Sequence, residues 1–166
     1  MALRYAQLVA LACIGFSTGI YVSDWAGGRL FRLEADASSA VFYQQVIHIQ
    51  YQMFMPVFVF GAVLGTGVWL FLIRERWRSL EFLCVAIAFA SALAIAIMTV
   101  SVSVPINNTL MTWDRASPPA DFHEQWAPWD AVNAARCVLA SLAFVLSLVA
   151  ALIVSPKSSA GGRAGA

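Results

Sequence analysis

Charged residues are scarce in this sequence. Only 11% of the 166 residues are charged, 61% are hydrophobic, and the mean hydropathy is +0.76. A soluble domain of this length needs more polar surface, so the composition indicates an integral membrane protein. The net charge is +1 and no basic face is evident, which argues against a nucleic-acid-binding protein.

Cysteine and histidine are equally sparse. Cys13, Cys84 and Cys137 each lie within an apolar run, where cysteine behaves as a small hydrophobic residue. Their spacing fits no metal motif and no disulfide framework, and the sequence contains no CxxC, HxxH or ExxH pattern around its two histidines. The sequence therefore predicts no metal and no other cofactor.

Four apolar runs dominate the chain and predict helices over about 5–24, 44–73, 80–104 and 129–154. Each is long enough to cross the ~30 Å hydrocarbon core of a bilayer. The sequence thus predicts an all-α, integral membrane four-helix bundle, with residues 1–166 as a single domain. The first run competes with a signal peptide, but no small-x-small cleavage site follows it, which favours a retained helix.

The segments between the runs are more polar. We expect loops over 25–43 and 105–128, and a disordered tail over 155–166 that is rich in Ser, Gly and Ala. Proline marks helix boundaries, because its ring removes an N–H group and restricts the preceding residue. Pro56 is expected to kink the second helix, Pro105 to end the third, and Pro128 to lie in the first turn of the fourth.

Basic residues predict the orientation in the membrane. Four spans place both termini on one side, and that side carries six basic residues against four on the other. The positive-inside rule then predicts cytoplasmic termini, in the plasma or inner membrane if the source is bacterial. The opposite, non-cytoplasmic ends of the helices gather most of the polar residues, which predicts a site there. These residues are Tyr21, Asp24, Gln44, His48, Tyr51, Gln52, Asn107, Asn108, Asn133 and Arg136.

His48 is the one histidine on a predicted helix and the candidate catalytic base. A neutral imidazole near the interface could accept a proton from a weakly acidic substrate, with Tyr51 and Gln52 on the same helix face as substrate contacts. The alternative is a hydrogen-bonded histidine that stabilises helix packing. A metal site is a less favoured alternative. It would require further ligands, such as His123, Asp24, Asp121 and Glu124.

Asn107, Asn108 and Arg136 are candidate catalytic groups that would contact a substrate oxygen. Asparagine amides donate hydrogen bonds to a carbonyl or oxyanion, but they also cap helices. An arginine at the edge of a membrane span is costly unless it is paired, so a structural salt bridge is an equal alternative to an anion-stabilising role. Candidate partners in such a salt bridge are Asp24, Asp114 and Asp130.

Three tryptophans lie in the predicted outer loop and at the start of the fourth helix. Trp113, Trp126 and Trp129 could form flat walls for an aromatic ligand or an interfacial aromatic belt. Trp129, Asn133 and Arg136 follow an i, i+4, i+7 pattern, so they share one helix face. Asn133 is therefore a further candidate for substrate binding.

These motifs together resemble one family of membrane proteins. The pattern is V-P-x-N-N at the end of a helix, a spaced Trp, a Pro-rich linker, and W-x-x-W-x-x-x-N-x-x-R that opens a final apolar helix. The residues that match it are Val104, Pro105, Asn107, Asn108, Trp113, Pro118, Pro119, Trp126, Trp129, Asn133 and Arg136. The pattern and the four-span layout resemble the anthrone oxygenase family.

The resemblance implies oxidation of an anthrone, or a related flat phenolic or quinonoid compound, by molecular oxygen without metal or flavin. The residues singled out above fit the roles that this reaction needs, with His48 as base, Asn107, Asn108 and Arg136 on the substrate oxygen, and the tryptophans as walls. The expected partners are the lipid bilayer, an aromatic small molecule and O2, while the oligomeric state stays open. The alternative is a non-catalytic binding or accessory protein. Its polar cluster would be closed, whereas a catalytic site requires an open pocket.

Overall fold

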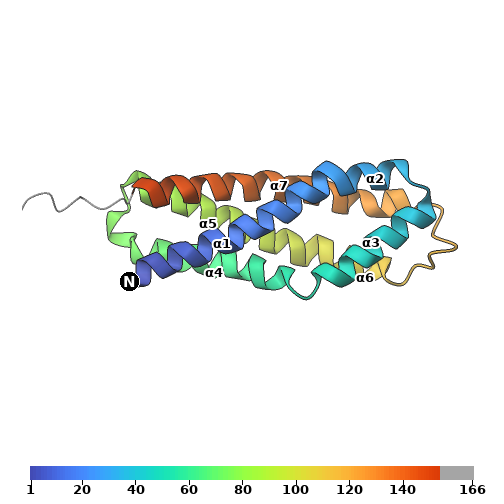
Figure 1. Ribbon diagram of the computed structural model, residues 1–166, viewed down its shortest axis with the longest axis horizontal. Coiled ribbons are helices and arrows are strands. Elements are labelled where there is room, and N and C mark those ends of the chain that lie inside the picture. The colour runs from blue at the N-terminus through green and yellow to red at the C-terminus, as the bar shows by residue number, and fades with distance from the viewer. Residues whose placement is uncertain (154–166) are drawn as a thin grey trace, which may run out of the picture.

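Four helical stretches run along the molecule (Figure 1), and each is long and apolar enough to cross a membrane. They are Ala2–Glu34, Met55–Leu72, Leu80–Leu110 and Phe122–Ile153. The computed structural model describes residues 1–153, and this part of the chain contains no strand. The prediction of an all-α membrane bundle is confirmed.

The first half of the described chain, through the second stretch, consists of several segments. In chain order they are α1 (Ala2–Ser23), the π-helical turn η1 (Asp24–Gly28), α2 (Arg29–Glu34), α3 (Ala37–Tyr51) and α4 (Met55–Leu72). The second half of the described chain comprises η2 (Arg74–Arg76), α5 (Leu80–Met98), the π-helical turn η3 (Thr99–Ser103), α6 (Val104–Leu110) and α7 (Phe122–Ile153).

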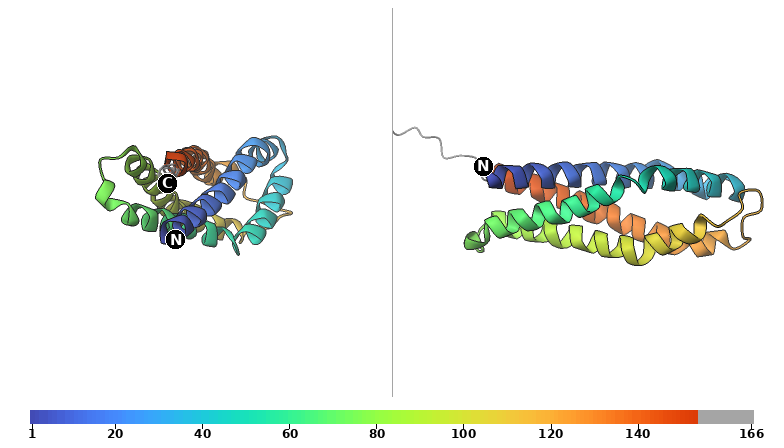
Figure 2. Two further views of the ribbon diagram at one scale, coloured as in Figure 1. Left: turned by 60° about the vertical axis from the view of Figure 1, so that its left-hand side comes forward. Right: turned by 90° about the horizontal axis from the view of Figure 1, so that it is seen from below.

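The long helices form a closed ring of contacts. Both α1 and α5 pack against α4 and against α7. The chain runs up and down, so the first residues of α1 and the last residues of α7 lie at the same end of the bundle (Figures 1 and 2). The shorter helices α2, α3 and α6 lie together at the opposite end, which we call the α3 end.

Small residues allow α1 and α4 to approach closely. A Cβ atom added to Gly65 would lie 2.8 Å from the backbone nitrogen of Ala10. Ala10 also packs with Trp69 and Val85 in a buried apolar cluster beside this contact. Without a hydrophobic driving force between helices in lipid, such close packing supplies much of their association.

The first helix is longer than predicted. Residues 25–43 were expected to form a loop, but η1 and α2 continue α1 to Glu34, and α3 already begins at Ala37. Arg32 explains the difference. Its side chain is buried and pairs with Asp24 and Asp130, so this polar segment satisfies its charges inside the bundle.

The second helix is broken where a kink was predicted. A single helix over 44–73 was expected, but a turn over 52–54 separates α3 from α4. Pro56 lies in the first turn of α4, where its missing N–H group costs nothing. Continuing the helix through this point would place the proline ring against the carbonyl group four residues earlier.

The third and fourth helices are also longer than predicted. Pro105 does not end the third helix, because the wide π-helical turn η3 precedes it and the chain stays helical to Leu110. Pro128 lies inside α7 rather than in its first turn, and burial of Phe122 and Trp126 stabilises the turns before it. The predicted loop over 105–128 therefore shrinks to residues 111–121. The predicted disordered tail, 155–166, lies outside the described residues.

Hydrogen bonds hold α3 against the end of α6. The Gln45 side-chain amide donates to the carbonyl oxygens of Leu110 and Trp113 at 2.9 and 3.0 Å. Arg115 Nε in turn donates to Gln45 Oε1 at 2.6 Å. These contacts position α3, which carries His48, beside the third transmembrane stretch.

Candidate functional site

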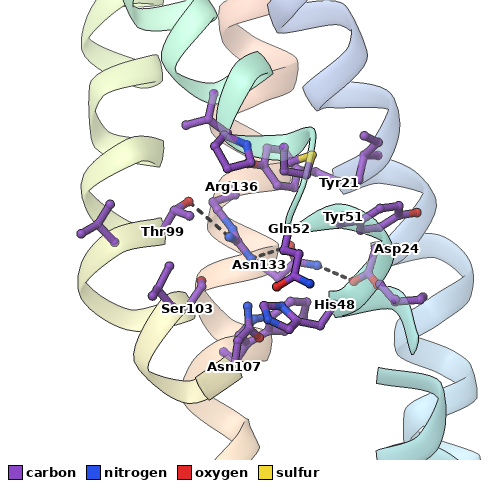
Figure 3. A pocket seen from close by; sticks show the side chains of 18 of the residues that line it. Tyr21, Asp24, His48, Tyr51, Gln52, Thr99, Ser103, Asn107, Asn133 and Arg136 are labelled. Carbon is purple, nitrogen blue, oxygen red and sulfur yellow. Dashed lines mark hydrogen bonds between the residues drawn. The ribbon is translucent and has the colours of Figure 1, made fainter. Parts of the chain in front are cut away.

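A pocket of about 350 Å³ lies in the half of the bundle nearest the α3 end, and Figure 3 shows it from close by. This volume suits a small organic ligand. Residues from all four helical stretches and from α3 enclose it. Its polar and aromatic lining residues are Tyr21, Asp24, Gln44, His48, Tyr51, Gln52, Thr99, Ser103, Asn107, Asn108, Trp129, Asn133 and Arg136. Its apolar lining comes mainly from Ile20, Ile47, Met55, Val59, Phe60, Ala96, Val100 and Val104.

The pocket opens through the side of the bundle. The lining residues that are classed as exposed lie on two edges, and we call the opening between these edges the lateral mouth. One edge is Gln52, Pro56 and Phe60, and the other is Val100, Val104 and Asn108. The sequence had predicted a site at the end of the bundle, but a buried cluster that includes Leu110, Phe122 and Trp126 fills that end.

Arg136 is the charged group deepest in the pocket wall. Arg136 is 5% exposed. Its Cζ atom lies 5.1 Å from the ring centroid of Tyr21 and 5.3 Å from that of Trp129. It donates to Thr99 Oγ1 at 3.3 Å and to Asn133 Oδ1 at 3.0 Å, as the dashed lines in Figure 3 show. The predicted direct salt bridge to Asp24, Asp114 or Asp130 is not formed.

Asn133 connects Arg136 to a second buried arginine. Its Nδ2 donates to Asp24 Oδ2 at 2.6 Å, and Asp24 also accepts two hydrogen bonds from Arg32 at 2.9 and 3.1 Å. Arg32 further donates to Asp130 Oδ1 at 3.0 Å. Both amide atoms of Asn133 are therefore committed, which fixes its orientation and holds the Arg136 guanidinium in place.

Several polar atoms of the pocket wall are buried without a protein partner among the described residues. Arg136 Nε, Tyr21 Oη, Ser103 Oγ, Asn107 Oδ1 and Trp129 Nε1 belong to this set. Buried polar groups in proteins are almost always hydrogen-bonded. Five such atoms around one cavity are therefore available to hydrogen-bond the polar edge of a ligand.

His48 lies in the pocket wall on α3, close to the lateral mouth. Its side chain is half-buried, and burial lowers the pKa of the imidazole below the usual range of histidine. The imidazole is therefore neutral at pH 7 and has a free lone pair. This is the protonation state that a general base needs.

The structure brings most of the sequence-predicted site residues together. Eight line the pocket: His48, Tyr51, Gln52, Asn107, Asn108, Trp129, Asn133 and Arg136. Trp113 and Trp126 do not line it. Trp126 stacks on Trp129, with ring centroids 4.6 Å apart, inside the cluster that fills the α3 end, and Trp113 packs on the edge of that cluster.

Two polar residues of the pocket had no counterpart in the sequence prediction. Ser103 lies one turn and Thr99 two turns before Asn107, and the three form a polar stripe at intervals of four residues on an otherwise apolar helix. This spacing was a usable signal. Thr99 and Ser103 also bound the π-helical turn η3, and such turns occur frequently at functional sites.

Possible metal ligands are scattered. Within residues 1–153, no three His, Cys, Asp or Glu side chains come together as a cluster that could hold a metal ion. His123, the second histidine, is exposed and stacks on Phe122, with ring centroids 3.9 Å apart. The alternative ligand set of His48 with His123, Asp24, Asp121 and Glu124 is therefore not assembled in this part of the chain.

Comparison with known proteins identifies the family. A family model described as "Anthrone oxygenase" matches residues 43–146, which include every pocket-lining residue outside the first helix. Comparisons with curated proteins and with solved structures gave no significant match. Since the matched stretch is more than half of the chain and contains the motifs that resemble this family, the protein belongs to the anthrone oxygenase family.

Proposed function

We propose that the protein is a membrane oxygenase that binds a flat phenolic or quinonoid compound, such as an anthrone, and oxidises it with O2. The observation that carries this proposal is the pocket itself. It combines an apolar lining, unpartnered polar atoms on one wall and a mouth that opens sideways between membrane-spanning helices. An aromatic compound dissolved in the bilayer could enter through such a mouth.

Oxidation of an anthrone by O2 requires from the protein only a base and polar contacts to the substrate. An anthrone methylene loses a proton to His48, and the resulting carbanion–enolate transfers electrons to O2. One oxygen atom of O2 becomes the new carbonyl of the anthraquinone, and the other leaves as water with the two methylene hydrogens. The reaction needs no further oxidant or reductant.

Each pocket residue has a role in this proposal. Asn107, Asn108 and Arg136 contact the substrate oxygen, and Trp129 forms a flat wall. Tyr51, Gln52 and Asn133 complete the contacts around the ring system. Trp113 and Trp126, which the resemblance implied as walls, support Trp129 from behind.

The orientation in the membrane is part of the proposal. Cytoplasmic termini would place the pocket in the non-cytoplasmic half of the bilayer, because its lining residues lie in the half of the bundle nearest the α3 end and the first residues of α1 lie at the other end (Figure 1). Arg74, Arg76 and Arg78, in and beside the turn η2, then face the cytoplasm.

A second candidate function is ligand binding without catalysis. The open cavity argues against a purely structural polar cluster, in which each group would be paired with another. It is equally compatible with a carrier or accessory protein for the same class of compound. The two functions differ in whether O2 is consumed.

Oxygen uptake tests the proposal directly. We expect detergent-purified protein with emodin anthrone to consume O2 faster than the Asn107→Ala/Arg136→Ala double variant, with anthraquinone formed in equal amount. Since anthrones oxidise slowly in air, only the excess over the variant counts. Equal rates would assign the pocket to binding alone or to another substrate. Metal analysis of the same sample would show whether stoichiometric copper, iron or zinc accompanies the activity.

A further inference from the structure

Arg136 carries a buried positive charge without a carboxylate partner. In the described part of the chain, no carboxylate oxygen forms a salt bridge with its guanidinium, although the residue is only 5% exposed. Its hydrogen-bond acceptors, Thr99 and Asn133, are neutral. Burying an unpaired charge in a membrane protein is costly, and intramembrane arginines are normally paired or functional.

The nearby carboxylates are already neutralised by other arginines. Asp24 forms a two-pronged pair with Arg32 and accepts a third hydrogen bond from Asn133. Asp130 pairs with Arg32 at 3.0 Å and with Arg29 at 3.8 Å. Arg29 and Arg32 thus pair with the two carboxylates of this region, Asp24 and Asp130. Arg136 is the third arginine of the region and has no direct carboxylate pair.

The pocket contains no other group that would neutralise Arg136. Its lining residues from α4 and from α5 to α6 include no ionisable side chain. The ionisable groups that face the pocket are Tyr21, Asp24, His48, Tyr51 and Arg136. Of these, Asp24 is the one carboxylate, and it is paired with Arg32, while burial lowers the pKa of His48 and keeps its imidazole neutral at pH 7.

The free polar atoms near Arg136 are mainly hydrogen-bond donors. Its Nε–H is unpartnered, and the hydroxyl groups of Tyr21 and Ser103 can donate as well. A ligand oxygen with a negative charge would satisfy these donors and the charge of Arg136 together. Charge-assisted hydrogen bonds of this kind are about twice as strong as those between neutral groups.

We propose that the pocket binds its aromatic ligand as the aryl-oxide anion, with the negative oxygen against Arg136. This inference rests on the proposed function and specifies the charge of the ligand that the pocket selects. A phenolic ligand that is neutral in the bilayer releases its proton to solvent when it binds. Asp24 and Asn133 act as positioning residues, because they orient Arg136 without touching the ligand oxygen.

A hydroxyanthraquinone dye reports its own ionisation. The visible absorption of 2-hydroxyanthraquinone shifts to longer wavelength when its phenol ionises, so a spectral pH titration measures the pKa of the bound dye. We expect it about 1–3 below that of the dye in empty micelles of the same detergent, as for a group beside one opposite charge. In the Arg136→Gln protein the bound pKa should return to the micelle value, and in Arg136→Lys part of the shift should remain.

Controls separate this inference from the proposed function. Arg29→Gln removes a charge from the same end of the bundle outside the pocket, so the bound dye should keep its lowered pKa. If the wild-type protein binds no dye, the proposed ligand class is wrong. If dye binds with an unchanged or raised pKa, or if Arg136→Gln retains the full shift, the anion inference is wrong and the ligand class stands.

A second measurement does not depend on the folding of a variant. The wild-type protein should bind 2-hydroxyanthraquinone at least tenfold more tightly than 2-methoxyanthraquinone at a pH above the bound pKa, because the methyl ether cannot ionise. This preference should disappear at a pH below the bound pKa. Equal affinity for the two compounds at both pH values would overturn the inference.

Discussion

Asn133 determines how Arg136 is presented to the pocket. An asparagine has one acceptor and one donor end, and here the acceptor end takes Arg136 while the donor end takes Asp24. A carboxylate at this position would repel Asp24, and an apolar residue would leave both partners unsatisfied. The residue therefore links the ion pair of Asp24 with Arg32 to Arg136.

The lowered pKa of His48 predicts how the proposed oxidation depends on pH. Because burial lowers its pKa, the imidazole stays neutral at and above the usual histidine value of about 6.5. Turnover should be constant over the neutral range and fall only as the pH drops below that value and His48 becomes protonated. Oxygen uptake between pH 5 and pH 8 measures this profile, over a range of roughly one and a half pH units on each side of the usual value.

Substitution tests whether protonation of His48 causes the fall in turnover at low pH, which is the acidic limb of the pH profile. We expect His48→Gln to reduce kcat by about 10²–10⁴-fold, the range of general base catalysis, and to remove the acidic limb. His123→Gln, which changes the exposed second histidine, should leave both unchanged. Full turnover in His48→Gln would exclude His48 as the base.

Two π-helical turns and one break shape the helices around the pocket. The turns η1 and η3 lie at the level of the pocket, with Asp24 in the first and Thr99 and Ser103 in the second. The break between α3 and α4 lets α3 turn toward α6, so that His48 and Asn107 line one cavity. Three straight helices would have placed these residues in a continuous packed seam.

The contact between α1 and α4 depends on a glycine. An added Cβ at Gly65 meets the backbone of Ala10 at 2.8 Å, and backbone cannot move aside as a side chain can. Gly65→Ala should therefore lower the free energy of unfolding by about 1–3 kcal/mol through overpacking. Thermal unfolding in detergent measures the loss.

Gly19 is the matched control for this substitution. It lies in the same helical pair, but an added Cβ meets no heavy atom within 4 Å. Gly19→Ala should leave the melting temperature unchanged or raise it, because alanine favours a helix by about 0.5–1 kcal/mol over glycine. Equal destabilisation by the two substitutions would contradict the role assigned to the α1–α4 contact.

The lateral mouth lies between helices that are long and apolar enough to cross a membrane. Its edges, at Phe60 and Val100, are about half exposed and lie within membrane-spanning stretches. Under the proposed function, an apolar compound would reach the pocket from lipid without crossing the polar end of the bundle. O2, which is more soluble in hydrocarbon than in water, would enter by the same route.

A bulky residue at the mouth should obstruct access from the lipid. We expect Val100→Trp to lower kcat/KM for an apolar substrate more than it lowers kcat at saturation, since the substitution leaves the pocket floor intact. Val138→Trp, at a lipid-facing position of α7 that is 68% exposed and outside the pocket, is the control and should behave like the wild-type protein. Steady-state oxygen uptake in nanodiscs distinguishes the two. Unchanged kcat/KM in Val100→Trp would place the access route elsewhere.

Sequence reasoning determined the fold class and the composition of the site. The apolar runs required four membrane helices, because no soluble packing could bury that much apolar surface. Polar residues at the same ends of those helices, together with the motif from Val104 to Arg136, brought eight pocket residues into one prediction. Helix spacing alone determines on which face of a helix a residue lies and how far along the bundle it lies. These two properties were enough to predict most of the polar pocket residues.

The tertiary structure decided which polar groups pair and where the pocket opens. Sequence spacing could not show that Arg32 takes both Asp24 and Asp130 and thereby leaves Arg136 without a carboxylate, because these residues meet only across helices. Nor could it show that Trp126 packs away from the cavity, or that the mouth lies between α4 and the stretch from α5 to α6. Both follow from side-chain packing between helices, since small interhelical shifts exchange a buried face for an open one.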